Sequence, residues 1–388
     1  MHYDFDKNPD RRGTHSVKWD VKDNELPMWV GDMDFATAPA VAEAILKRAS
    51  HGIYAYSVVP DEWYNAIISW WERRHGFKID KTWLQFCTGV VPAISCAVQR
   101  VTNVGDNVVV ITPAYDIFFH SIENTGRHTL ECPLSYCDGA YAIDFERLES
   151  VLSEPLSTML ILCNPHNPVG KVWSKEDLQR IGELCLKHGV TVLSDEIHCD
   201  LTAPDVNYTP FAAASETCKQ ISLTAISSSK AFNLAGLQSA AVFVANEHLR
   251  AKVVRGLNSD ELAEPNAFAI EATIAAFSPE GGVWLDSLRE HIATNKATVV
   301  EYLRKNLPEV KAIEQNATYL MWLDCSAFCD DAEALCDFIR AETGLFVSCG
   351  NKYRGNGRYF LRLNVACPEQ TLRDGLKRLK VGIKKYKS

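Results

Sequence analysis

The sequence lacks an apolar run that could cross a membrane as a helix. Its longest uninterrupted apolar stretches, such as residues 159–163, have the length of a strand, whereas a spanning helix needs about 20 apolar residues. The first residues, MHYDFDKNPDRRG, are polar and lack the apolar centre of a secretion signal. We therefore expect a cytoplasmic protein whose thiols stay reduced.

The sequence also lacks an excess of positive charge. It has 40 Lys and Arg against 49 Asp and Glu, a formal net charge of -9. This balance excludes a broad electrostatic grip on nucleic acid or an anionic membrane, while a local basic pocket stays compatible with it. No internal repeat or low-complexity segment is apparent, and 47% hydrophobic residues exclude disorder for most of the 388-residue chain.

Signatures of metal and nucleotide sites are missing as well. The 13 cysteines are scattered, and the closest pair, Cys325 and Cys329, lacks C-x2-C spacing and a second pair to complete it. We interpret most of them as small buried apolar residues. Asp195 and His198 lack a convincing third ligand nearby in the sequence, so we expect no metal. The absence of G-x4-G-K-[ST] excludes a Walker-type nucleotide site.

What is present is an alternation of strand and helix patterns. Short apolar runs at 107–112, 158–163, 190–194, 221–226 and 240–245 are separated by amphipathic stretches. This alternation predicts βαβ units and a mostly parallel sheet. Such sheets bind ligands at the carboxyl ends of their strands, so we expect the binding and catalytic residues there.

The pattern changes near residue 281, where a second α+β domain is predicted. The turn-like segment SPEGG at 278–282 marks the expected boundary. We predict a large domain over 45–280, and a small domain over 281–388 joined by residues 1–44. Helices are expected at 38–50 and 62–75, and in the small domain at 283–305, 332–343 and the basic C-terminus, with strands at 319–323 and 359–365.

Four loops that follow predicted strands carry residues suited to binding or catalysis. Gly89 stands between an apolar run and a helix pattern, where backbone N–H groups bind anions, although on this signal alone a plain turn is the favoured interpretation. Asn167 lies in NPHNPVG, where two Asn-Pro pairs make a rigid loop with or without a ligand. Asp195 ends a buried strand, where a carboxylate is costly unless it is paired.

The fourth loop places three serines before Lys230 in apolar surroundings. Such a lysine is partly desolvated, which lowers its pKa and makes its amine nucleophilic. A phosphate-binding loop without catalysis is the alternative. Together with Tyr115, which follows another strand, these loops offer what pyridoxal phosphate needs: an amine, an anion for the ring nitrogen, an amide, an aromatic ring and a phosphate cradle.

The sequence resembles the fold-type I pyridoxal-phosphate enzymes of the aminotransferase class I/II superfamily, and within it the MalY/PatB branch of cystathionine β-lyase-like C–S lyases. This resemblance implies an α/β fold in which a large domain holds a mostly parallel seven-stranded sheet sandwiched by helices, beside a smaller α+β domain. It spans nearly the whole chain. The segments that carry it are MWVGDMDF, YAYS, TGVVP, TPAYDIF, NPHNPVGKVW, DEIHCDL, SSSKAFNLAGLQ, TYLMWLD and FLRLN.

The resemblance also implies roles for matching residues. Lys230 is the catalytic residue that forms the Schiff base with pyridoxal 5'-phosphate, and Arg362 and Gly31 bind the substrate carboxylate. Tyr54 reaches the site of the partner subunit, which makes the active unit a homodimer. The remaining cofactor-binding residues are Gly89, Val90, Tyr115, Asn167 (which also contacts the substrate), Asp195, His198, Ser227 and Ser229.

The branch determines the expected reaction. Many aminotransferases carry Tyr where His198 stands and Arg where Gln238 stands, and both differences match the C–S lyases. We therefore predict a β-lyase that cleaves L-cystathionine or related cysteine S-conjugates into a thiol such as homocysteine, pyruvate and ammonia, in methionine biosynthesis. An aminotransferase is the alternative, and a non-catalytic regulatory protein is a more remote one. No nucleic acid or membrane partner is expected.

Overall fold

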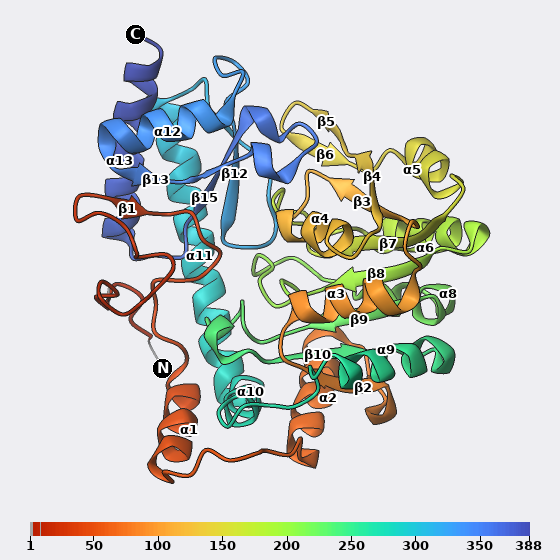
Figure 1. Cartoon of the computed structure of the whole chain (residues 1–388). Helices are drawn as coiled ribbons and strands as arrows, with labels where there is room; N and C mark the ends of the chain where they lie inside the picture. The colour runs from red at the N-terminus through yellow and green to blue at the C-terminus, as the bar shows by residue number, and fades with distance from the viewer. Residues whose placement is uncertain (1–2, 8) are drawn as a thin grey trace.

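The computed structural model describes residues 3–7 and 9–388, and a seven-stranded sheet lies at its centre (Figure 1). Neighbouring strands from β9 to β4 run parallel, whereas β10 is antiparallel to both of its neighbours. The predicted mostly parallel seven-stranded sheet is thus confirmed. In spatial order the strands are β2 (Leu84–Cys87), β10 (Ala240–Phe243), β9 (Ser222–Ile226), β8 (Thr191–Asp195), β7 (Ser157–Cys163), β3 (Asn107–Thr112) and β4 (His128–Pro133).

The central strands form where the sequence has short runs of branched and small apolar residues. Every residue of β9 is buried, and so is every residue of β8 except the first. Parallel strands covered by helices on both faces need such continuous apolar runs. The predicted positions of these strands therefore agree with the structure to within two residues at each end.

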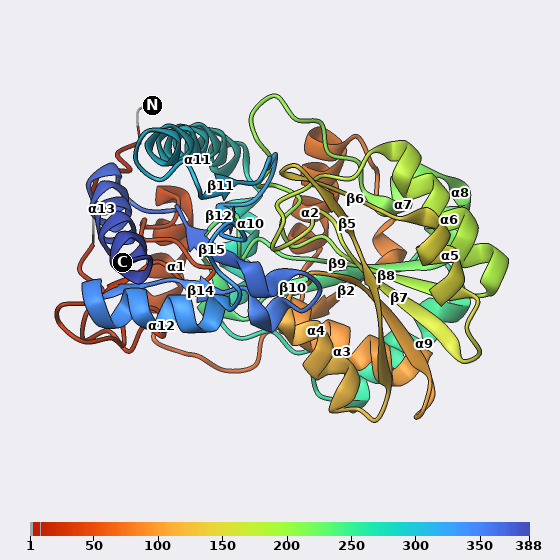
Figure 2. The same cartoon turned by 90° about the horizontal axis from the view of Figure 1, so that it is seen from above.

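Helices cover both faces of the sheet, as predicted. Figure 2 shows α3, α4 and α9 on one side of the sheet and α5 to α8 on the other. Two separate apolar clusters fill these two layers. The helices are α3 (Val90–Val101), α4 (Asp116–Glu123), α9 (Glu247–Ser259), α5 (Phe145–Leu152), α6 (Lys175–His188), α7 (Phe211–Ala214) and α8 (Glu216–Gln220).

A second, four-stranded antiparallel sheet lies beside the first, in the order β11-β12-β15-β14. A two-residue strand of the N-terminal segment, β1, pairs with β13, so this segment packs against the C-terminal part of the chain. The elements are β1 (Leu26–Pro27), β11 (Lys311–Ala312), β12 (Leu320–Asp324), α12 (Ala332–Thr343), β13 (Leu345–Phe346), β14 (Ser348–Cys349), β15 (Phe360–Asn364) and α13 (Glu369–Tyr386).

Three further helices and a hairpin complete the chain. The helix α10 (Ala269–Ala276) contacts both α1 (Pro39–Ser50) and α2 (Asp61–His75), and β5 (Ser135–Cys137) pairs with β6 (Ala140–Ala142). The predicted domain limit at residue 45 falls inside α1, which is continuous. The division into domains over 45–280 and over 1–44 with 281–388 stays a prediction.

The segment at 278–282 differs from its expected role as a turn. It forms the start of the long helix α11 (Pro279–Asn306), with the Ser278 hydroxyl accepting a hydrogen bond from the Gly281 N–H at 3.1 Å. A Cβ at Gly281 would lie 2.1 Å from the carbonyl oxygen of Ala276. Gly281 is therefore needed for close backbone approach. The prediction that this segment is a turn is wrong, while the domain limit near it stays a prediction.

Among the described residues, none of the helices is both long and apolar enough to span a bilayer. All 13 cysteines carry free thiols, and apart from Cys137 and Cys349 they are buried. The interpretation of most cysteines as small buried apolar residues is thus confirmed.

Candidate active site

A cavity of about 430 Å³ opens at the carboxyl ends of the parallel strands, between the two sheets. Loops after β2, β3, β7, β8 and β9 line it, together with the N-terminal segment and β15. This is where an open α/β sheet binds its ligands. The predicted site residues that line the cavity are Gly31, Gly89, Val90, Tyr115, Asn167, Asp195, His198, Ser227, Ser229, Lys230 and Arg362.

Lys230 points across the cavity to the N-terminal segment. Its Nζ donates a hydrogen bond of 2.7 Å to the carbonyl oxygen of Gly31. Burial lowers the pKa of Lys230, and the positive charge of Arg362 lowers it further, while Asp32 and Asp195 act in the opposite direction. A lysine with a lowered pKa holds more of its amine in the free form at neutral pH, which is the form that acts as a nucleophile or base.

Asp195 is the last residue of β8 and lies 3% exposed at the base of the cavity. Among the described residues, only the backbone N–H of Ile197 donates to its carboxylate, at 3.1 Å. Burial raises the pKa of Asp195 to about 6. An under-paired buried carboxylate favours a cationic partner, and the protonated ring nitrogen of pyridoxal phosphate is such a partner.

His198 lies beside Asp195 as a neutral imidazole. Burial lowers its pKa to about 3, and the charges of Lys230 and Arg362 act in the same direction. Its Nδ1 is buried without a hydrogen-bond partner among the described residues. Such an orphaned polar atom is unusual in a folded protein, and it marks a place where a ligand can supply the missing contact.

Arg362 is the buried cation of the site, on β15 and 5% exposed. Its guanidinium donates a hydrogen bond of 3.2 Å to Oδ1 of Asn167 and one of 3.0 Å to the carbonyl oxygen of Trp29. Its Nε has no hydrogen-bond partner among the described residues. A guanidinium with spare donors suits a carboxylate. Because Oδ1 of Asn167 accepts from Arg362, the Asn167 amide N–H groups are left for the cavity.

The anion cradle is built mainly from backbone. Gly89 is the residue before α3, so the first N–H groups of this 12-residue helix face the cavity. The Ser227 hydroxyl donates a hydrogen bond of 2.6 Å to the carbonyl oxygen of Ser239 and accepts one of 3.0 Å from the Ser229 N–H. Ser227 therefore orders this loop, and the binding of a phosphate by its hydroxyl stays a prediction.

Tyr115 lies at the start of α4, with its ring 5.7 Å from that of Phe118 and edge-on to it. Burial raises its pKa to about 12, so the phenol stays protonated. Tyr54 is the predicted site residue that the chain does not bring to its own cavity. It is 58% exposed, and its hydroxyl donates 2.7 Å to the carbonyl oxygen of Ala49.

The structure adds cavity residues that sequence reasoning did not assign. Trp29 and Lys352 line the cavity directly. The hydroxyl of Tyr319, which is fully buried, donates 2.9 Å to the same Gly31 oxygen that accepts from Lys230. For Tyr319 and the Trp-rich N-terminal segment, the sequence is equally compatible with lining the substrate pocket and with packing in the core, whereas no sequence signal indicates Lys352.

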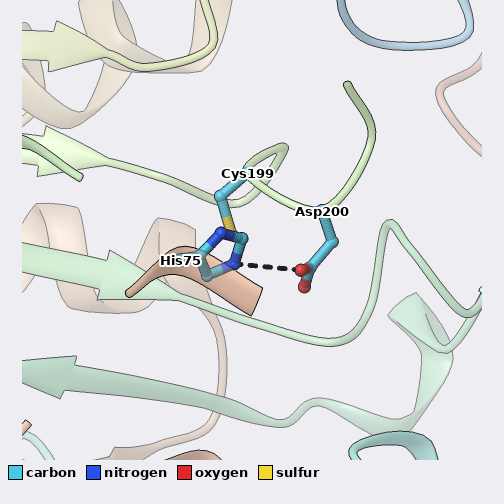
Figure 3. Close-up of side chains that lie close together, drawn as sticks. All are labelled: His75, Cys199 and Asp200. Carbon is cyan, nitrogen blue, oxygen red and sulfur yellow. Dashed lines mark hydrogen bonds and ion pairs between the residues drawn. The ribbon is translucent and has the colours of Figure 1, made fainter. Parts of the chain in front are cut away.

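A second polar cluster lies outside the cavity and links α2 to the loop after β8 (Figure 3). His75 Nε2 lies 3.0 Å from Oδ1 of Asp200, and Trp70 Nε1 donates to both carboxylate oxygens at 3.0 and 3.2 Å. Cys199 completes the cluster, but burial raises its pKa well above the usual range. Because the carboxylate of Asp200 already has these hydrogen-bond partners, we interpret the cluster as a structural link between α2 and the loop after β8.

Comparisons with known proteins identify the class. The sequence profile of the family "Aminotransferase class I and II" matches residues 24–379, and the chain belongs to this family. The chain is 46% identical over 386 residues to the cystathionine β-lyase PatB of Bacillus subtilis, covering 98% of this chain and 99% of that protein. It is 33% identical to the protein MalY of Escherichia coli, covering 96% and 97%.

A solved structure places the fold in the same group. Cystalysin from Treponema denticola, which contains pyridoxal 5'-phosphate, superposes with a TM-score of 0.96 at 32% identity, and the match covers all of both chains. The predicted resemblance to the MalY/PatB branch is confirmed.

Proposed function

We propose that this protein is a pyridoxal-phosphate-dependent C–S β-lyase. It cleaves L-cystathionine or related cysteine S-conjugates by α,β-elimination to a thiol, pyruvate and ammonia. The observation that carries the proposal is the facing pair of Lys230, with its lowered pKa, and Asp195, an under-paired buried carboxylate. The near full-length similarity to PatB and MalY supports the same reaction.

The residues of the cavity fit the cofactor. Asp195 would face the ring nitrogen, and Tyr115 would face the ring itself. The Asn167 amide and His198 would face the polar edge of the ring, and the N-terminus of α3 together with Ser229 would face the phosphate. When bound, pyridoxal phosphate supplies an electron sink for the negative charge that develops at the substrate Cα.

The side chains of the protein then have distinct tasks. Arg362 binds the substrate α-carboxylate, and its bonds to Asn167 and Trp29 fix the guanidinium in place. The Lys230 amine removes the Cα proton, which is the step that a lysine with a lowered pKa can perform near neutral pH. The Gly31 carbonyl oxygen holds the Lys230 amine in reach of the cavity. Loss of the thiolate from Cβ follows.

We also make proposals for the oligomeric state and the cellular role of the protein. We propose a homodimer in which Tyr54 of one protomer reaches the site of its partner, in keeping with the exposure of that side chain. A cytoplasmic role in methionine biosynthesis suits a protein whose cysteines are unpaired and whose thiol product from cystathionine is homocysteine.

A substrate panel tests the function. Purified protein supplied with cofactor is given L-cystathionine and other cysteine thioethers, and pyruvate release is measured with and without a keto acid. We expect pyruvate without any keto acid, and none from Lys230→Ala. An aminotransferase would instead need the keto acid and form no free thiol.

A further inference from the structure

Two opposite charges line the cavity and have no task in the mechanism above. Lys352 lies in the 3-10 turn η3 (Asn351–Tyr353) after β14, and Asp116 is the first residue of α4. Their side chains are 35% and 22% exposed, whereas Arg362 is 5% exposed. The pair therefore lies nearer to solvent than the buried cation, at the rim of the cavity.

Both charges have capacity left for a ligand. Lys352 Nζ and Asp116 Oδ2 are 3.6 Å apart, which is too long for a good hydrogen bond. Among the described residues, each of these two groups forms an ion pair with the other and with no further charged side chain, and Lys352 Nζ also lies 5.3 Å from the centroid of the Tyr353 ring. An ammonium has three donors and a carboxylate several acceptor sites, so most of these stay available.

Backbone contacts join the two loops that carry Lys352 and Asp116, which together form the rim of the cavity. The Ala114 N–H donates 2.8 Å to the carbonyl oxygen of Tyr353, which joins the loop of Lys352 to the loop of Asp116. Gly355 has a positive φ of +55°, and a Cβ there would lie 3.0 Å from the nitrogen of Pro113. This close approach fixes the two loops that carry Lys352 and Asp116 before any ligand arrives, which reduces the entropic cost of binding.

One aromatic ring links the rim to the buried cation. Arg362 Cζ lies 4.9 Å from the centroid of the Tyr353 ring, and Lys352 Nζ lies 5.3 Å from the same centroid. Tyr353 itself is fully buried, whereas Arg362, Lys352 and Asp116 all line the cavity. A ligand whose α-carboxylate binds Arg362 can therefore extend within the same cavity towards Lys352 and Asp116.

We propose that Asp116 and Lys352 bind the distal amino-acid group of the substrate, with Lys352 on its carboxylate and Asp116 on its ammonium. This inference rests on the proposed lyase function and narrows its substrate class. The favoured substrates are cysteine thioethers whose leaving group is itself an amino acid, as in cystathionine. Asp116 and Lys352 do not strengthen the binding of S-alkyl cysteines, which have no distal charge.

Four substrates separate the two charges. S-ethyl-L-cysteine has no distal charge, S-aminoethyl-L-cysteine has only the ammonium, S-carboxyethyl-L-cysteine has only the carboxylate, and L-cystathionine has both. For each holoenzyme variant, kcat/KM is measured by pyruvate release and divided by the value for S-ethyl-L-cysteine. This ratio removes any general loss of folding or activity.

The variants are Lys352→Met, Asp116→Asn and the conservative Lys352→Arg. For Lys352→Met we expect the S-carboxyethyl and cystathionine ratios to fall about fivefold, the size of a partly exposed ion pair. For Asp116→Asn the S-aminoethyl ratio should fall by a similar factor. The changes should appear in KM, and Lys352→Arg should restore the carboxylate ratio. Lys187→Met, which removes an exposed pair with Glu149, is the matched control.

The alternative is that the pair is only an ion pair that joins the two parts of the chain. In that case both variants would lower all four activities by a common factor, and ratios that move less than twofold would overturn the proposal. If the wild-type protein releases pyruvate from none of the four substrates, S-ethyl-L-cysteine included, the lyase function fails and the rim assignment fails with it.

Discussion

The guanidinium of Arg362 donates a hydrogen bond of 3.2 Å to the side-chain oxygen of Asn167, across the cavity between the two sheets. One residue comes from β15 of the four-stranded sheet, and the other from the loop after β7 of the seven-stranded sheet. The bond therefore fixes the two side chains relative to each other, as the proposed binding of the carboxylate by Arg362 and of the cofactor by Asn167 requires. It makes the geometry of the site depend on how the two sheets meet.

The first prediction concerns this cation. Arg362→Lys keeps the positive charge but cannot make the planar, paired hydrogen bonds that a guanidinium makes to a carboxylate. We expect kcat/KM for L-cystathionine to fall about 100-fold, or about 2.7 kcal/mol. Steady-state kinetics measures it. A fall of less than threefold would show that charge alone, without the fork geometry, binds the substrate.

The second prediction concerns the buried carboxylate in the cofactor-free protein. Burial raises the pKa of Asp195 from 3.8 to about 6. A carboxyl group whose pKa is raised on folding takes up protons in the folded state, so its destabilising effect is absent below about pH 4 and complete above about pH 6. We expect Asp195→Asn to be more stable than the wild-type protein at pH 7, by up to about 3 kcal/mol.

Denaturant unfolding of both cofactor-free proteins between pH 4 and pH 8 checks this prediction. The stability difference should grow as pH rises through the interval and then level off. Glu196, whose pKa burial also raises to about 7, is present in both proteins. The charge of Asp195 contributes to that raised pKa, so part of the stability difference near pH 7 comes from Glu196. A difference that does not change with pH would contradict the assignment of the raised pKa to Asp195.

The third prediction concerns the start of α11. A Cβ at Gly281 would meet the Ala276 carbonyl oxygen at 2.1 Å, whereas a Cβ at the neighbouring Gly282 would lie 3.6 Å from the Trp70 ring, an ordinary contact. We expect Gly281→Ala to destabilise the protein by more than about 2 kcal/mol. Gly282→Ala should be neutral or stabilise by up to about 1 kcal/mol. Thermal melting compares them, and equal effects would contradict the close approach.

The fourth prediction concerns the homodimer. Tyr54→Ala and Lys230→Ala are each expected to lose most of their activity. In a mixed dimer, one site would hold Lys230 from the first variant and Tyr54 from the second. Unfolding and refolding the two variants together should therefore restore about a quarter of wild-type activity. If mixing restores no activity, Tyr54 does not act across the subunit interface.

Much of the fold could be predicted because local patterns match it. The apolar runs of β3, β7 and β8 and the loops after them bring Tyr115, Asn167 and Asp195 to one edge of the sheet, as the rule for parallel sheets requires. The start of α11 was not predictable from the Gly-Gly pair, because the reason for Gly281 is a contact with the preceding helix.

The remaining parts of the site depend on distant contacts. Lys352 reaches the cavity because the Ala114–Tyr353 backbone bond joins two loops far apart in the sequence. The hydroxyl of Ser227 is engaged inside its own loop by Ser239, which a serine-rich motif does not reveal. The predicted role of Tyr54 requires a second protomer, so the structure of one chain does not test it.

The central claim is that this cavity eliminates a thiol from a cysteine thioether, with Lys230 removing the Cα proton. Its most direct test is the amount of free thiol and pyruvate that the holoenzyme forms from L-cystathionine when no keto acid is present. The account predicts one thiol released for each pyruvate, over many turnovers, and no release by Lys230→Ala. Absence of both products from the wild-type holoenzyme, or equal release by Lys230→Ala, would contradict it.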